Sequence, residues 1–254
     1  MASVTYQQLV DEALAACMEG WDWSVFDGRY TEQRPSWDYR DIARRYLSRA
    51  TTVLDLGTGG GELLRSLAPL PPRVVATEGY QPNVAVAERN LRPLGVQVLD
   101  TTGLGEDQYP LPLRDGSFDL VLNRHESYHP SEVHRVLAPG GHFVTQQVGG
   151  RDLEELNDAL GAPPHDYRDW SLEPAVRQAE EAGLQVIDRR EELVPVAFHD
   201  IGAVIMFLRF NPWQVPDLGV DRYAPRLRAL HDRLSSGRPL SVGCHRFLLI
   251  CRRP

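Results

Sequence analysis

The residues best suited to chemistry lie in and around a glycine-rich segment, VLDLGTGGGELL, at residues 53–64. Residues 51–56 are mostly β-branched or aliphatic and predict a strand that contains Asp55, whereas Glu62 opens a helical pattern of leucines. Four glycines lie between them. A backbone without Cβ atoms can adopt positive φ and approach a ligand closely, and the first N–H groups of the helix would face the same ligand. We therefore expect a nucleotide-like cofactor at this turn.

The glycine spacing discriminates between two kinds of cofactor. A dinucleotide-binding turn has the pattern GxGxxG, but the sixth position counted from Gly57 is Glu62, whose carboxylate would repel a pyrophosphate. The segment instead contains Asp55, Gly57, Gly59 and Gly61 in the order DxGxGxG. This order disfavours a nicotinamide oxidoreductase.

Four successive stretches resemble the class I S-adenosylmethionine-dependent methyltransferases. They are the DxGxGxG turn, VVATEGYQPN, LPLRDGSFDLVLNRHES and HRVLAPGGHFVTQQV, which together cover roughly residues 51–148. The resemblance implies an α/β fold with a Rossmann-like sheet of seven strands, mostly parallel with the last strand antiparallel, and flanking helices. It also implies S-adenosyl-L-methionine as the cofactor and methyl transfer as the reaction.

The resemblance further implies cofactor contacts at the strand ends. Glu78 would hold the ribose hydroxyls, Asn123 would offer its carbonyl to the methionine amino group, and either Asp100 or Asp107 would face the adenine amine. Tyr80 would stack on the adenine, although Gly79 replaces the bulky residue often found beside the acid. The expected cofactor-binding residues are Asp55, Gly57, Thr58, Gly59, Gly61, Glu78, Tyr80, Asp100 and Asn123.

Two histidines follow the fourth core strand, whose carboxyl end lies at the edge where open parallel sheets hold ligands. His125 or His129 could take a proton from the methyl acceptor, because histidine titrates near neutral pH. The alternative for each is a hydrogen-bonded loop residue. One of Gln146 and Gln147, at the end of the fifth core strand, should point to the pocket. Because the sulfonium is a strong electrophile, positioning alone could also suffice.

Two further segments should cover this edge of the sheet. The leader, residues 1–50, has an aromatic cluster that predicts either a lid over the ligand or rings that fix the leader to the core. An insertion at residues 199–240 contains the apolar helix Ile201–Phe210. We expect a pocket between residues 21–37 and 201–213, with His125 and His129 at its floor.

The expected elements can be placed along the chain, with the core at residues 51–198 and the last strand within residues 241–254. Helices are expected at 6–18, 36–48, 82–91, 152–160, 172–182, 201–210 and 223–234, and strands at 51–56, 74–78, 96–99, 118–122, 142–148, 184–187 and 247–251. The length of 254 residues suits a single domain.

Composition limits the partners. The net charge is −8, which disfavours a polyanion such as RNA, and all 27 basic residues are arginine, which suggests a high-GC bacterial gene. The three cysteines lack zinc-binding spacing, so we expect no metal and a reducing cytoplasm. We see neither a basic leader signal nor an apolar run of membrane-spanning length. We expect a monomer or a homodimer.

The sequence therefore predicts methyl transfer to an O or N atom of a small, partly apolar molecule. Two alternatives stay open. An rRNA or tRNA methyltransferase would share the same core, and a non-catalytic S-adenosylmethionine-binding protein would keep the two strand-end acids.

Overall fold

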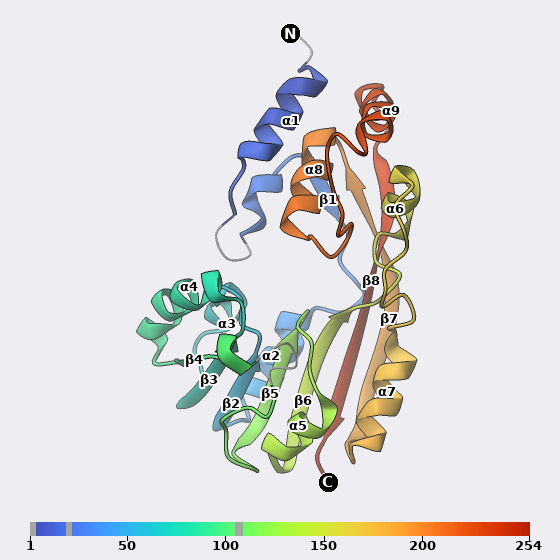
Figure 1. Ribbon diagram of the computed structural model, residues 1–254. Coiled ribbons are helices and arrows are strands. Elements are labelled where there is room, and N and C mark those ends of the chain that lie inside the picture. The colour runs from blue at the N-terminus through green and yellow to red at the C-terminus, as the bar shows by residue number, and fades with distance from the viewer. Residues whose placement is uncertain (1–3, 19–21, 105–108) are drawn as a thin grey trace.

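The computed structural model describes residues 4–18, 22–104 and 109–254, and these form one eight-stranded sheet in the order β1-β7-β8-β6-β5-β2-β3-β4 (Figure 1). Five neighbouring strands are parallel, namely β2 (Thr52–Leu56), β3 (Arg73–Glu78), β4 (Gln97–Asp100), β5 (Phe118–Arg124) and β6 (Leu137–Val148). Antiparallel pairing adds β8 (Leu240–Arg252), β7 (Gln185–Phe198) and β1 (Tyr30–Glu32). The Rossmann-like architecture expected from the sequence is confirmed, with one additional strand.

Helices cover both faces of the parallel strands, which explains why these strands are apolar almost throughout. One buried cluster packs α2 (Tyr39–Leu47), α3 (Glu62–Ser66) and α4 (Gln81–Leu91) on the first face. A second cluster packs α5 (Pro130–Val136) and α7 (Leu172–Glu181) on the other. The strand order reverses between β5 and β2, so a crevice is expected at their carboxyl ends.

The last two strands of the chain are far longer than their sequence predicts. We expected only 184–187 and 247–251, but β7 and β8 are 14 and 13 residues long and pair continuously from Gln185 to Phe198 apart from one irregularity near Asp188. The charged run before Leu193 is largely exposed, and Pro195 lacks an N–H, so neither gives the usual pattern of a strand. Pairing with β8 determines the length instead.

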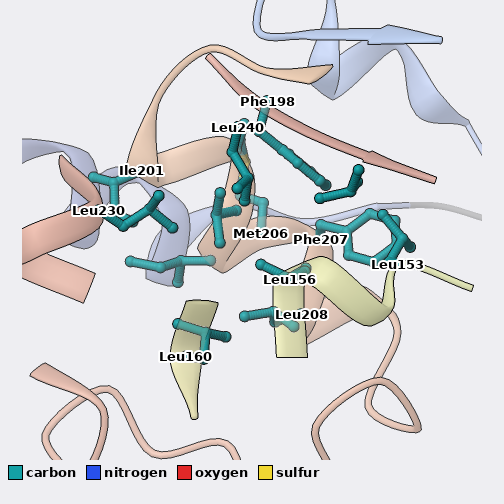
Figure 2. Close-up of a cluster of buried hydrophobic side chains, with 14 of the residues drawn as sticks. Leu153, Leu156, Leu160, Phe198, Ile201, Met206, Phe207, Leu208, Leu230 and Leu240 are labelled. Atoms are coloured by element: carbon teal, nitrogen blue, oxygen red, sulfur yellow. The ribbon is translucent and has the colours of Figure 1, made fainter. Parts of the chain in front are cut away.

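The outer half of the β7–β8 ribbon supports a third cluster, which we call the upper cluster (Figure 1, Figure 2). It joins α1 (Tyr6–Ala15), α6 (Glu154–Leu160), α8 (Ile201–Phe210) and α9 (Ala224–Ser235) to the ribbon. Its members include Leu153, Leu156, Leu160, Phe198, Ile201, Met206, Phe207, Leu208, Leu230 and Leu240. The apolar helix expected at 201–210 is therefore confirmed and is covered on all sides. No helix in the described ranges is long and apolar enough to cross a membrane.

The aromatic residues of the leader pack on two different cores. The Tyr30 ring stacks on Phe207 of the upper cluster at a centroid distance of 6.5 Å, and Phe26 is buried there too. Trp37 and Tyr39 are buried against the sheet beside α2. These rings fix the leader in place, as the second interpretation predicted, while Trp21 lies outside the described residues. The strand β1, which the sequence did not reveal, arises because Tyr30 pairs with Phe198 at the end of β7.

A two-nitrogen ion pair joins the leader to the insertion. Arg29 donates from Nε and Nη2 to the two carboxylate oxygens of Asp200, at 2.8 and 2.7 Å. Asp200 also accepts the N–H of Ala203 and so caps the start of α8. Burial acts to raise the pKa of Asp200, but the Arg29 hydrogen bonds prevail and hold it below its usual range.

We predict that Arg29→Gln lowers the free energy of unfolding by about 1.5 to 3 kcal/mol, because a partly buried carboxylate loses a charged partner. The measurement is urea denaturation followed by circular dichroism. Arg44→Gln, which removes the exposed pair with Asp41, is the control and should cost less than about 1 kcal/mol. Equal effects of the two substitutions would contradict this account of the Arg29–Asp200 pair.

Candidate functional site

The glycine turn after β2 has the backbone that its sequence predicts. Gly57, Gly59 and Gly61 all adopt positive φ, at 67°, 62° and 82°. The turn is held against β3 by Thr77, whose Oγ1 accepts the N–H of Gly57 at 3.1 Å and whose carbonyl accepts the N–H of Thr58 at 2.9 Å. Thr77 was not identified from the sequence, because a threonine within a strand gives no sign of this role.

Close packing around the turn explains two of the glycines. A Cβ on Gly61 would lie 2.7 Å from Cγ of Leu91, so a side chain here would push α4 away. A Cβ on Gly57 would lie 2.2 Å from Cγ of Glu126. The Glu126 side chain therefore lies against the turn, and burial raises its pKa. Glu126 belongs to the stretch LPLRDGSFDLVLNRHES, but the sequence predicted no role for it.

Two buried carboxyl groups lie at the ends of the neighbouring strands β2 and β3. Asp55 and Glu78 are only 5% and 4% exposed. Burial raises the pKa of each to about 7, and the charge of Glu78 adds to the shift at Asp55. The N–H of Tyr80 donates to Glu78 Oε1 at 2.7 Å, which orients that carboxylate. Hydroxyl or cationic groups of a ligand would relieve the cost of these buried acids, so the residues fit an S-adenosylmethionine site.

The expected adenine side of the site is more open. Tyr80 is 64% exposed at the start of α4, so its ring is accessible to a planar ligand. Asp100 accepts the N–H and the hydroxyl of Thr102 at 2.9 and 2.7 Å, and these bonds lower its pKa. Asp100 thus caps a short turn through Oδ1. The competing Asp107 lies outside the described residues.

Asn123 lies in a buried hydrogen-bond network at the end of β5. It is fully buried, and its Oδ1 accepts hydrogen bonds from Thr145 and Gln147 at 2.8 and 2.5 Å. Its backbone carbonyl accepts the Tyr39 hydroxyl at 3.0 Å. Each carbonyl thus has a hydrogen-bond partner within the chain. The contact of Asn123 with a methionine amino group stays a prediction.

His125 belongs to a hydrogen-bond chain that fixes its tautomer. The indole N–H of Trp37 can only donate, and it donates to Gln146 Oε1 at 2.8 Å. The amide nitrogen of Gln146 is therefore the group that faces His125 Nε2 at 2.9 Å, and it donates to that ring nitrogen. His125 then carries its own proton on Nδ1. As arranged here, His125 offers a donor and has no free lone pair with which to act as a base.

The surroundings of His125 also keep it neutral. It has a φ of 61° and is solvent-exposed, yet desolvation by nearby protein atoms lowers its pKa well below the usual value. The positive charges of Arg124 and Arg246 lower the pKa further. The expectation that His125 lies at the ligand-binding edge is consistent with this position.

His129 lies outside this hydrogen-bond chain. It is exposed directly before α5, and its Nδ1 meets Ser131 Oγ at 2.8 Å. The backbone N–H of His129 donates to the Tyr109 hydroxyl at 3.0 Å. These contacts are those of a hydrogen-bonded loop residue, which was the alternative interpretation.

The walls expected for a pocket need correction. Met206 and Phe207 are 1% and 6% exposed, so they belong to the interior of the upper cluster, whereas Trp213 is 46% exposed. The helix α1 packs on α8, so the apolar side chains of α8 are buried and cannot line a pocket. Two cavities of about 420 and 440 Å³ adjoin at Tyr46 and Arg49, at the opposite edge of the sheet from the glycine turn.

Comparisons with known proteins agree with this geometry. Residues 54–145 match the methyltransferase domain family. An uncharacterized methyltransferase of Mycobacterium tuberculosis is 28% identical over 237 residues, which cover 89% of this chain and 92% of the relative. The biotin biosynthesis bifunctional protein BioHC of Teredinibacter turnerae is 31% identical over 59% of this chain, which spans only 29% of that protein.

Two further matches extend the comparison. A ubiquinone biosynthesis O-methyltransferase of Ruegeria pomeroyi is 26% identical over 59% of this chain and 66% of its own length. The crystal structure of a SAM-dependent methyltransferase from Aquifex aeolicus has the same fold, with a TM-score of 0.51 and 18% identity over 86% of this chain and 90% of that one. Together with the glycine turn and the strand-end acids, these matches identify a methyltransferase domain at residues 54–145 and agree with the resemblance to the class I S-adenosylmethionine-dependent methyltransferases.

Proposed function

We propose that this methyltransferase binds S-adenosylmethionine over the ends of β2 and β3 and methylates an O or N atom of a small, partly apolar molecule. The observation that carries the proposal is the pair of buried acids, Asp55 and Glu78, beside a turn with three positive-φ glycines. Burying two acids is costly in a folded protein, so their presence beside bare backbone supports a ligand that brings hydroxyl groups and positive charge.

The contacts described above support a role in cofactor binding for several residues. Glu78 would accept the ribose hydroxyls, and the turn with Gly57, Thr58, Gly59 and Gly61 would let the ligand lie against the backbone. Tyr80 would stack on the adenine. Asp55 would contribute negative potential beneath the turn. When bound, S-adenosylmethionine supplies an electrophilic methyl group, and the chain provides orientation and exclusion of water.

The acceptor would lie beyond the end of β5, on the side toward β6. His125 lies there with its Nδ1–H available as a donor, so its role in the proposal is to orient the acceptor. His129 is assigned no chemical step. Positioning can contribute roughly 7 to 11 kcal/mol to a transfer of this kind, so a protein base is not required.

A small acceptor is favoured over RNA for two reasons. The net charge of −8 opposes a polyanion, and the upper cluster lies beyond the carboxyl ends of β5 and β6 (Figure 1). The names of the curated relatives include enzymes of biotin and ubiquinone biosynthesis, which also supports a small molecule. RNA methylation and cofactor binding without catalysis are the alternatives that the experiments must exclude.

We predict that Glu78→Gln weakens S-adenosylmethionine binding by about 1.5 to 3 kcal/mol, because hydrogen bonds to a charged acceptor are lost. Isothermal titration calorimetry measures the effect. Glu88→Gln, on the exposed surface of α4, is the matched control and should leave the affinity unchanged. Unaltered binding by a folded Glu78→Gln protein would refute the assignment.

The affinity for S-adenosylmethionine should depend on pH. Burial raises the pKa of Glu78 to about 7, so the carboxylate that accepts the ribose hydroxyls forms as the pH rises through that value. We expect affinity to increase by about tenfold from pH 6 to pH 8, because the charged fraction of a carboxyl group with this pKa rises about tenfold between these two pH values. Titrations at both pH values, with Glu78→Gln showing a smaller change, check this. A pH-independent affinity would argue against an ionised acid at the ribose.

The tautomer of His125 is a separate prediction. We expect a neutral ring protonated on Nδ1 at pH 6, because Gln146 donates to Nε2 and desolvation lowers the His125 pKa. Long-range ¹H–¹⁵N correlation spectra of the ring nitrogens report the tautomer directly. Trp37→Phe is the control, since loss of the indole donor should release the Gln146 amide and allow both tautomers. A proton on Nε2 in the wild type would restore His125 as a candidate base.

A further inference from the structure

Arg124, the last residue of β5, is a cationic side chain without a partner at the proposed acceptor position. It is solvent-exposed, and among residues 4–18, 22–104 and 109–254 it makes neither a hydrogen bond nor an ion pair. Desolvation lowers its pKa, and the charges of Arg246 and Arg40 lower it further. Glu32 acts on Arg124 electrostatically, but it lies too far away to form an ion pair.

The sheet register brings a second arginine to the same face. Arg124 of β5 lies opposite Gln146 of β6, and Gln146 lies opposite Leu248 of β8. Arg246 is two residues from Leu248 on the same strand, so its side chain leaves the same face of the sheet. Arg246 is 12% exposed and donates through Nη1 to Asp152 Oδ1 and to the His245 carbonyl. Asp152 therefore balances Arg246 but leaves Arg124 uncompensated.

A neutral donor completes the arrangement. The backbone N–H of His125 donates to the Gln146 carbonyl at 2.8 Å, which fixes this residue beside the end of β6. Because Gln146 occupies Nε2, the ring presents Nδ1–H. A guanidinium fork beside an N–H donor suits a carboxylate, which accepts several hydrogen bonds in one plane.

We infer that Arg124 and His125, in the positive potential of Arg246, bind a carboxylate of the methyl acceptor. This inference rests on the proposed function and narrows its substrate class to small carboxylic acids. Gln146 and Arg246, which share a face of the sheet with Arg124, lie on β6 and β8, whereas the glycine turn and its acids lie over β2 and β3 on the other side of β5. The geometry therefore assigns the carboxylate to the acceptor and leaves the cofactor to the acidic side.

The test uses benzoate and benzamide, which differ in charge but hardly in shape, titrated into the full chain saturated with S-adenosylhomocysteine. We expect benzoate to bind the wild type at least tenfold more tightly than benzamide. Arg124→Gln should remove this preference while S-adenosylmethionine affinity stays within twofold. Glu32→Gln should strengthen benzoate binding, because it removes a carboxylate that acts on Arg124 without pairing with it.

Arg114→Gln is the matched control, since Arg114 is exposed in the loop before β5 and its loss changes the net charge equally. If Arg114→Gln weakened benzoate binding as much as Arg124→Gln, net charge alone would explain the loss, and the inference would be overturned. Equal affinity of the wild type for the two probes would overturn it as well. If Arg124→Gln weakens S-adenosylmethionine binding instead, Arg124 holds the cofactor's carboxylate and the assignment is wrong. Failure of the wild type to bind S-adenosylmethionine at all would refute the proposed function. The preference for benzoate over benzamide, measured without S-adenosylhomocysteine, would then test the carboxylate site independently of the cofactor.

Discussion

The antiparallel pairing of β7 with β8 is the constraint on which the rest of the structure depends. Register runs from Gln185 opposite Arg252 to Phe198 opposite Leu240, so one ribbon takes part both in the sheet and in the upper cluster. Backbone hydrogen bonds along the ribbon fix the distance between these two parts. Because α8 and α9 lie between β7 and β8 in the sequence, the two strands of this ribbon join the upper cluster directly to the sheet.

The leader reinforces this attachment from the other end of the chain. Tyr30 pairs with the ribbon and stacks on Phe207, while Trp37, seven residues later, donates to Gln146 beneath the sheet edge. The short segment between them therefore passes beside the proposed acceptor position. Contacts at both ends fix the path of this segment, so it connects the upper cluster with the hydrogen-bond chain to His125.

The electrostatics of the edge divide along the sheet order. Acids gather over β2 and β3, where Asp55 and Glu78 are buried, and arginines gather on β5 and β8. A sulfonium cofactor suits the first side and an anionic acceptor the second, so the protein would bring opposite charges together at the point of transfer. The fold supplies this division because each strand delivers its last residues to the same edge in a fixed order.

The sequence alone determined the part of the sheet edge at which we propose that the cofactor binds. The glycine turn, the acid at the end of each of the first two core strands, and the apolar core strands are local patterns, and local backbone chemistry decides them. The family and the Rossmann-like sheet could therefore be predicted, as could the apolar helix at 201–210.

Only the tertiary structure decided the part of the edge at which we propose that the acceptor binds. The length of β7 and β8, the extra strand β1 and the burial of Asn123 under Tyr39 depend on partners distant in the chain. The tautomer of His125 depends on Trp37, which lies 109 residues from the Gln146 amide that it orients. A hydrogen bond between such residues leaves no periodic trace in the sequence, because its geometry exists only after the leader has packed on the sheet.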